Sequence, residues 1–171
     1  MGLTRKIGAD MSFKTTDLCD QFEKTVRVFT PIFRDFGGRI SFHGEAVTVK
    51  CFEDNSRIKE LSATPGRGKV LVVDGGGSPR CALLGDVIAA DLVKNGWEGL
   101  VMFAYVRDKA ALAGLNIGVK ALGNIPKRSF KRAEGQVNIP IEIGGHTCNP
   151  GDRIYADEDG VIILNESIAG K

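Results

Sequence analysis

Short apolar runs separated by turn residues form the main pattern along this chain. The runs at 69–74 and 100–103 are almost continuously apolar, which is typical of short strands buried on both faces. Residues 44–52 and 117–122 are rich in β-branched and small apolar side chains, and they predict two further strands. The pattern therefore indicates a domain built around a buried sheet.

Helical patterns lie between these runs. The clearest predicted helix begins at Gly85-Asp86 and ends at Asn95-Gly96, because asparagine and glycine are common at helix C-termini. Three shorter helices are predicted at 18–25 with Asp17 as the N-cap, at 57–63 with Ser56 as the N-cap, and at 109–114.

The last third of the chain contains strand and turn signals only. Strands are predicted at 137–143, 153–156 and 161–164, and glycine, proline and asparagine or aspartate mark the turns between them. Alternating strands and helices followed by consecutive strands predict one α/β domain with a mixed sheet or a partly open barrel. The sequence contains neither an internal repeat nor a linker that would indicate a second domain.

Composition and charge exclude several function classes. The net charge of +2 lacks the basic excess of a dedicated nucleic-acid binder, so we expect no specific nucleic-acid partner. No apolar run approaches the roughly 18 residues that span a bilayer, so we expect no membrane partner. Cys19, Cys51, Cys81 and Cys148 lie far apart, which argues against a zinc site or a disulfide framework. We expect reduced thiols in a cytoplasmic protein, with a short mitochondrial presequence as an open alternative.

Glycine is over-represented, at 22 of 171 residues, or about 13%, against roughly 7% in average proteins. Gly75 to Gly77 follow a buried strand, and consecutive glycines allow positive φ and close approach of the backbone to a ligand. The segment matches neither the P-loop nor the dinucleotide fingerprint, so a tight turn between strands is the alternative. We expect Gly75 to Gly77, together with Gly85, to bring the backbone to the edge of a ligand pocket.

Two other segments have the residue types of a binding site. The helix start at 85–88 presents free N–H groups that favour a carboxylate or phosphate, although Asp86 acting as an ordinary N-cap is an alternative. Arg107 and Asp108 follow the strand that ends near Phe103, where open α/β proteins place ligands. Arginine binds carboxylates through a planar fork, and aspartate is an oxygen ligand for Mg²⁺ or Mn²⁺. A solvated ion pair is the alternative.

The spacing of these residues resembles a known signature. Asp86, a 20-residue interval, Arg107 and Asp108 resemble class II, metal-dependent 4-hydroxy-4-methyl-2-oxoglutarate aldolases of the RraA-like family. That family also contains the regulator of ribonuclease activity A. The segments 74–78, 95–99, 150–152 and 155–161 extend the resemblance over most of the chain. It divides the chain into an N-terminal extension (1–16), an RraA-like domain (17–164) and a C-terminal tail (165–171).

The resemblance implies a β/β/α swivelling-domain fold, a homotrimer and active sites between subunits. It implies that Gly85, Asp86, Val87, Ile88 and Arg107 bind the substrate. Asp86, Arg107 and Asp108 would be catalytic, and Asp108 would hold a divalent cation, Mg²⁺ or Mn²⁺. The segment 103–106 departs from the Asp-Gly that family members often carry before the arginine. Longer members supply an acidic side chain from a C-terminal extension of a neighbouring subunit, and Glu166 is the candidate substitute for it here.

The implied activity is retro-aldol cleavage of 4-hydroxy-4-methyl-2-oxoglutarate, a small 2-oxo acid. Cleavage releases pyruvate through an enolate that the cation stabilises as a Lewis acid. Oxaloacetate decarboxylation passes through the same enolate, so we expect it at the same site. Arg107 would fix the substrate carboxylate, and Asp86 would orient waters on the metal, one of which takes the C4-hydroxyl proton. The motif cluster contains no lysine, which agrees with metal chemistry rather than a Schiff base.

The alternative from another class is a non-catalytic regulator that binds and inhibits a ribonuclease of the ribonuclease E type. Regulators of the bacterial type tend to lack the acid after the arginine, so Asp108 favours the enzyme. The basic run 127–132 is either a contact for such a ribonuclease or a solvated loop. A methyltransferase, the third interpretation, lacks the expected cofactor-binding glycine pattern.

Overall fold

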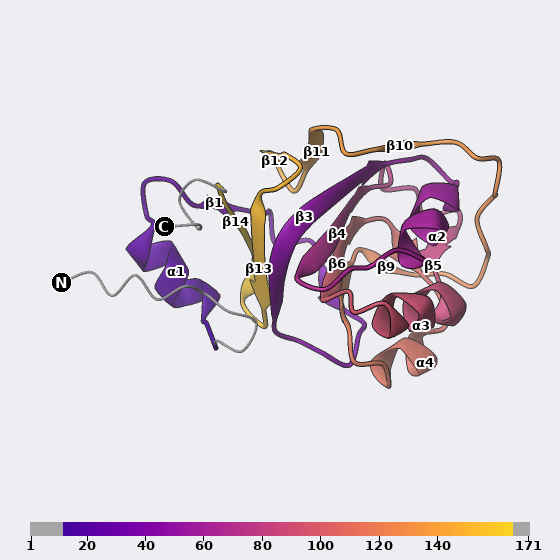
Figure 1. Cartoon of the computed structure of the whole chain (residues 1–171), viewed down its shortest axis with the longest axis horizontal. Helices are drawn as coiled ribbons and strands as arrows, with labels where there is room; N and C mark the ends of the chain where they lie inside the picture. The colour runs from indigo at the N-terminus through magenta and orange to yellow at the C-terminus, as the bar shows by residue number, and fades with distance from the viewer. Residues whose placement is uncertain (1–11, 166–171) are drawn as a thin grey trace.

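A curved, mixed β-sheet forms the centre of the structure, which is a computed structural model that describes residues 12–165 (Figure 1). Four helices accompany the strands in the described range: α1 (Thr15–Gln21), α2 (Ser56–Ser62), α3 (Asp86–Lys94) and α4 (Lys109–Ala113). The strands are β1 (Arg27–Val28), β2 (Arg34–Asp35), β3 (Phe42–Lys50), β4 (Lys69–Asp74), β5 (Ala82–Leu84), β6 (Gly99–Phe103), β7 (Tyr105–Val106), β8 (Gly118–Ala121), β9 (Gly123–Asn124), β10 (Gln136–Val137), β11 (Ile141–Ile143), β12 (His146–Cys148), β13 (Arg153–Asp157) and β14 (Gly160–Leu164).

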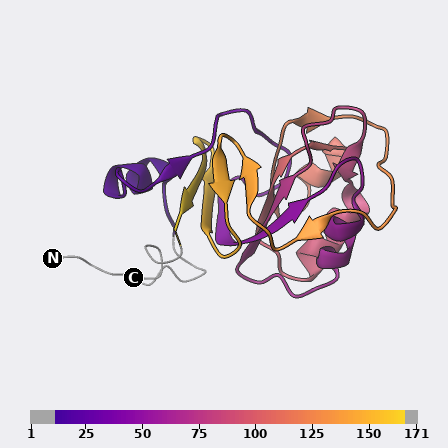
Figure 2. The ribbon, with the colours of Figure 1, turned by 90° about the horizontal axis from the view of Figure 1, so that it is seen from above.

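The main sheet has the strand order β1-β14-β13-β3-β4-β6-β8-β2. The short strand β10 pairs with the C-terminal end of β3. The four central strands β3, β4, β6 and β8 run parallel, and the strands on both sides of them are antiparallel. Helices α2, α3 and α4 lie together on one side of the parallel strands (Figures 1 and 2). This arrangement confirms the predicted single α/β domain with a mixed, partly open sheet.

Strand β4 shows why the continuous apolar runs belong in the centre of the sheet. Leu71 and Val73 pack into the core beneath the helices, whereas Val70 and Val72 pack into a second core on the opposite face. All four side chains are fully buried. Because strand side chains alternate between faces, a strand that is covered on both sides must be apolar at every position.

A separate three-stranded parallel sheet, in the order β5-β7-β9, lies beside the main sheet. Its strands have only two or three residues, which is too short for hydrophobic alternation to be detected in the sequence. This sheet was not predicted, and it changes the surroundings of Arg107. The arginine follows β7 and not, as expected, the strand that ends near Phe103.

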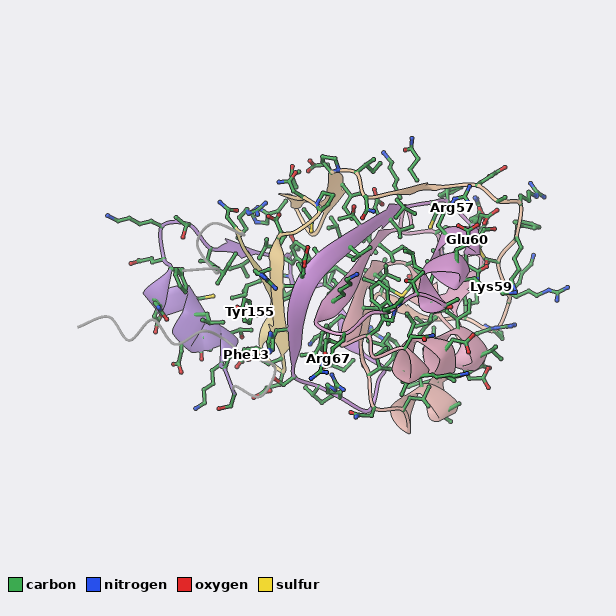
Figure 3. All side chains as sticks on the ribbon, viewed as in Figure 1. Phe13, Arg57, Lys59, Glu60, Arg67 and Tyr155 are labelled. Atoms are coloured by element: carbon green, nitrogen blue, oxygen red, sulfur yellow. The ribbon has the colours of Figure 1, made fainter. Side chains whose placement is uncertain are left out.

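Helix α1 begins earlier than predicted and ends earlier too. Asp17 is not its N-cap; the helix starts at Thr15, with Lys14 as the cap residue. The backbone N–H and the hydroxyl of Thr15 donate to the carboxylate of Asp157, at 2.8 and 2.6 Å. Figure 3 shows Phe13 next to Tyr155, and their rings are in edge-to-face contact. Tertiary contacts, which local signals do not reveal, therefore set the start of this helix.

Two other local predictions were wrong. Ser56 is the first residue of α2 and not its cap; the Asp54 carboxylate accepts the Ser56 N–H at 2.8 Å. The predicted strand at 137–143 is divided into β10 and β11, because Asn138 has φ of 59° and Pro140 provides no N–H for a ladder.

No helix in the described part of the chain is long and apolar enough to cross a membrane. The division into an extension, a domain and a tail stays a prediction, because 1–11 and 166–171 lie outside the described residues.

Candidate functional site

The register of the small sheet brings the two halves of the predicted site together. Leu84 on β5 is the register partner of Val106 on β7. The next residues, Gly85 and Arg107, therefore lie side by side, and the Arg107 N–H donates to the Leu84 carbonyl at 2.9 Å. The 20-residue interval in the sequence contains the rest of α3, then β6 and β7, and it returns the chain to the neighbouring strand end.

Asp108 caps helix α3 from a distance of 22 residues along the chain. Its Oδ2 accepts the backbone N–H of Asp86, the first helical residue, at 3.1 Å. Gly85 is the N-cap position and provides no side-chain bond, so Asp86 is not the N-cap that was considered as an alternative. Asp108 has left-handed backbone angles, φ 57° and ψ 44°, which aspartate and asparagine tolerate better than most residues.

Gly85 is required by space rather than by its backbone angles. Its φ of −131° is open to any residue. A Cβ at this position would lie 2.8 Å from Asp108 Oδ2 and 3.2 Å from Arg107 Nε. Asp108 Oδ2 and Arg107 Nε are themselves 3.9 Å apart, and both side chains are about two-fifths exposed. A glycine is therefore what allows the arginine and the carboxylate to approach the helix start.

The first turn of α3 leaves backbone donors available. Helix geometry provides no intrahelical acceptor for the first N–H groups. Asp108 takes the N–H of Asp86, and no acceptor is recorded within residues 12–165 for those of Val87 and Ile88. Ile88 is buried, whereas Val87 is 71% exposed. Two free N–H groups and the Arg107 guanidinium are thus donors of the kind that can bind a carboxylate.

A pocket of about 200 Å³ lies over this helix start. All five predicted substrate-binding residues line it, namely Gly85, Asp86, Val87, Ile88 and Arg107. Asp108 lies next to the pocket without forming part of its wall. The structure therefore brings the predicted residues together in one place.

The rest of the pocket wall was not predicted. It consists of polar and charged residues from α2, α3 and the loop after β9, together with Ala82: Asn55, Lys59, Ala82, Asp91, Arg128, Ser129 and Lys131. Figure 3 shows Lys59 on α2, with Arg57 and Glu60 as neighbours. The basic run 127–132 was the available signal, but sequence alone did not indicate that it folds back onto β5. It does so through the Ala82 N–H, which donates to the Lys127 carbonyl at 2.8 Å.

The Asp54 carboxylate fixes this basic loop against the start of α2 through two hydrogen bonds. The Asp54 carboxylate accepts the N–H groups of Ser56 and Arg132, at 2.8 and 2.6 Å. Burial favours a higher pKa for Asp54, but these hydrogen bonds outweigh it and hold the pKa below its usual range. Asp54 therefore stays ionised and anchors one wall of the pocket.

Asn55 is the polar residue of the pocket wall with an incomplete set of partners. It is 8% exposed, and its Nδ2 donates to the Leu83 carbonyl at 3.1 Å. That bond determines which end of the amide carries the oxygen. Oδ1 has no hydrogen-bond partner within the described residues. Buried acceptors without a partner are rare and often mark functional sites.

The glycine run 75–77 does not border the pocket, contrary to expectation. The N–H groups of Gly75 and Gly77 donate to the Phe103 carbonyl at 3.2 and 3.1 Å, and that of Gly76 donates to the Asp74 carboxylate at 3.0 Å. Since all three donors are used internally, the segment is a tight turn between β4 and β5. The alternative interpretation of this motif was correct.

The described chain holds no cluster of three or more histidine, cysteine, aspartate or glutamate residues that could form a metal cage. The carboxylates at the start of α3 are those of Asp86 and Asp108, while Asp91 lines the pocket one turn further along the helix. Mg²⁺ is often held by one or two carboxylates plus waters and substrate oxygens, so this donor set fits such a cation. Glu166, the other predicted acid, lies outside the described residues.

A family model for RraA-like proteins, described as Aldolase/RraA, matches residues 15–163. The chain belongs to the RraA-like family. A curated relative from Dechloromonas aromatica is 51% identical over 162 residues, which cover 92% of this chain and 99% of that protein. It carries the provisional name 4-hydroxy-4-methyl-2-oxoglutarate aldolase.

Two solved structures share the fold of this RraA-like chain at high identity. One, named as an S-adenosylmethionine:2-dimethylmenaquinone methyltransferase from Geobacillus kaustophilus, has a TM-score of 0.90 and 41% identity, and covers 93% of this chain and 99% of its own. The other is the RNA-processing inhibitor RraA from Thermus thermophilis, with a TM-score of 0.87 and 40% identity over 90% of this chain and 93% of its own. The predicted family and fold are thus confirmed.

Proposed function

We propose that this protein is a divalent-metal-dependent lyase. It would cleave 4-hydroxy-4-methyl-2-oxoglutarate to release pyruvate, and it would decarboxylate oxaloacetate at the same site. The observation that carries the proposal is the register of β5 and β7, which joins Arg107 and Asp108 to the start of α3. The provisional name of the relatives supports the same aldol chemistry.

Arg107 and the α3 amides would bind the carboxylate next to the 2-oxo group. The guanidinium forms paired, charge-assisted hydrogen bonds, and the N–H groups of Val87 and Ile88 add neutral donors. These donors come from a strand end and a helix start, so they are held in place before the substrate arrives. Rigid placement keeps the C3–C4 bond in a fixed orientation for cleavage.

Asp108 would hold the cation, with Asp86 beside it as the second local carboxylate. When bound, the cation supplies Lewis-acid stabilisation of the negative charge that develops as the C3–C4 bond breaks. Asp86 is exposed at the start of α3, where its carboxylate can accept the C4-hydroxyl proton through a water. Lys59 and Lys131 line the pocket but are exposed, unlike the desolvated lysines that form Schiff bases.

The basic residues of the pocket suit a second negative group. Besides Arg107, the wall carries the positive charges of Lys59, Arg128 and Lys131, against the carboxylates of Asp86 and Asp91. Both proposed substrates are dicarboxylates, so these basic side chains would bind the carboxylate that Arg107 does not. The distribution of charge in the pocket therefore favours dicarboxylic 2-oxo acids over pyruvate-sized monocarboxylates.

A pyruvate-release assay tests this function. Purified protein with Mg²⁺ or Mn²⁺ should release pyruvate from 4-hydroxy-4-methyl-2-oxoglutarate and from oxaloacetate, and EDTA should abolish the release. Asp108→Asn should reduce turnover by roughly 1,000-fold while the protein stays folded, because asparagine tolerates the left-handed backbone and keeps an acceptor for Asp86. Unchanged turnover in this variant would contradict the proposal.

The same assay distinguishes the regulator. The 40% identity to RraA from Thermus thermophilis supports a ribonuclease-binding role as the second candidate function. Absence of metal-dependent lyase activity, together with capture of a ribonuclease of the ribonuclease E type by the immobilised protein, would favour it over the enzyme.

We also infer a homotrimer that acts in the cytoplasm. Val87 is 71% exposed beside the pocket, and a neighbouring subunit would cover this aliphatic side chain. All four cysteines are free thiols, which suits a reducing compartment. Light scattering on the eluting protein should give about three times the chain mass of 18.4 kDa. A monomer at micromolar concentration would contradict the trimer.

A further inference from the structure

The carboxylate of Asp108 stands where a bound anion would be expected. It accepts the first N–H of α3 at 3.1 Å and lies 3.9 Å from the Arg107 guanidinium. The two donors that follow, on Val87 and Ile88, have no recorded acceptor in the described chain. A substrate carboxylate on those donors would therefore sit directly beside the Asp108 carboxylate.

Two like charges at neighbouring amides of one helix repel each other. We propose that Asp108 acts as an internal anion that keeps the carboxylate site of α3 closed to 2-oxo acids until a divalent cation binds. The cation must then bind before the substrate. This inference rests on the proposed function, because it assumes that a 2-oxo acid carboxylate is the ligand of α3.

The backbone prevents Asp108 from leaving this position easily. Its left-handed angles aim the side chain back toward α3, and the missing Cβ of Gly85 leaves space for Oδ2. Asp108 O also accepts the N–H of Leu112 at 2.9 Å, which fixes the residue at the start of α4. The negative charge is thus built into the site, where the Arg107 guanidinium 3.9 Å away is its counter-charge until a cation binds.

Asp91, another acidic residue of the pocket wall, does not have this position. It lies in the second turn of α3, away from the free N–H groups, and lines the pocket together with Lys59 and Lys131. Asp91 is therefore a matched control: it carries the same charge in the same pocket, but it lies outside the carboxylate site.

Calorimetric titration with pyruvate tests the inference on protein freed of metal by a chelator. Without metal, Asp108→Asn should bind pyruvate at least tenfold more tightly than the wild type, whereas Asp91→Asn should stay within threefold of it. Mg²⁺ should raise pyruvate affinity at least tenfold in the wild type and in Asp91→Asn, but by less than threefold in Asp108→Asn. If Asp108 had only a structural role, Asp108→Asn would lose pyruvate affinity together with turnover. A gain of pyruvate affinity in this variant therefore indicates that the Asp108 charge repels the ligand.

The outcomes separate this inference from the proposed function. Equal pyruvate affinity of metal-free wild type and Asp108→Asn, with Mg²⁺-dependent binding in the wild type, would overturn the inference and leave the function standing. Equal affinity of the wild type with and without Mg²⁺ would also overturn the inference. Absence of pyruvate binding in every sample would overturn both. Circular dichroism of each variant confirms that the folded protein was titrated.

Discussion

Two glycine-containing strand ends in this protein look alike in the sequence and differ in the structure. After β4, three consecutive glycines form a turn whose N–H groups donate to Phe103 and Asp74. After β5, a single glycine precedes a helix whose first N–H groups are left without intrahelical acceptors. The longer glycine run is closed and structural, whereas the single glycine opens onto the pocket.

The difference shows that glycine content is a poor indicator of a ligand site. A backbone segment can bind an anion only when its N–H groups have no acceptor within the protein. The turn at Gly75 to Gly77 fails this condition, and the start of α3 meets it. Substitutions at the start of α3 should therefore affect activity, whereas those in the glycine turn should affect stability.

Among substitutions in the two glycine regions and the pocket wall, the largest expected effect is that of Gly85→Ala on activity. The added Cβ would lie 2.8 Å from Asp108 Oδ2 and would displace the carboxylate and Arg107 from the helix start. We expect kcat/KM for pyruvate release to fall by roughly 100-fold, as when a single oriented transition-state donor is removed. Steady-state kinetics on the folded variant checks this. Activity within twofold of the wild type would show that the close approach is dispensable.

Gly75→Ala should act on stability instead. Its Cβ would meet the Ala104 and Leu83 side chains at 2.8 Å and the Phe103 carbonyl at 3.0 Å, all in the protein interior. We expect a loss of about 2–3 kcal/mol in the free energy of unfolding from overpacking. Urea denaturation measures this loss, and kcat/KM per folded molecule should change little. A selective loss of activity with unchanged stability would contradict the structural role of this glycine turn.

Asp54→Asn should loosen one wall of the pocket and change the pH dependence of stability. We expect a loss of about 2 kcal/mol at pH 7, because the carboxylate accepts two backbone N–H groups. The folded-state pKa of Asp54 is lowered, so its stabilisation is present above the unfolded pKa near 4. It disappears as the pH falls through the folded pKa. Denaturation at pH 7 and pH 3 should therefore show a smaller acid effect in the variant.

Gly76→Ala should have the smallest effect of the series. Its φ of +70° disfavours a side chain by about 1 kcal/mol. The nearest atom to the new Cβ is on the Phe52 ring, at 2.7 Å, and this ring is 55% exposed and free to move aside. A small loss in urea denaturation with unchanged kinetics is expected. A change in kcat/KM would place this turn in the site after all.

The sequence predicted the long elements of the fold and residues that the structure brings together at the candidate site. The runs at 69–74 and 100–103 became β4 and β6 because full burial on two faces leaves a continuous apolar signature. The helix at Asp86 was predicted with its correct C-terminal stop at Asn95. The 20-residue interval located Arg107 and Asp108 relative to the start of that helix.

The missed features depend on contacts between distant segments. Strands β5 and β7 have too few residues to show alternation, and their pairing decides where Arg107 lies. Asn55 and Lys131 reach the pocket only because residues 127–132 fold back onto β5 and α2, through bonds such as that from the Asn55 N–H to the Phe130 carbonyl. Nothing in their local sequence indicates this.

Helix α1 has a further consequence for the way the chain assembles. The Thr15 bonds join it to Asp157, 142 residues further along the chain, and Leu18 packs on Tyr155, Ile162 and Leu164. Strands β13 and β14 must therefore be formed before α1 has a surface on which to dock. With seven residues, the helix is too short to be stable by itself. We expect α1 to be the last element to fold and the first to exchange its amide hydrogens.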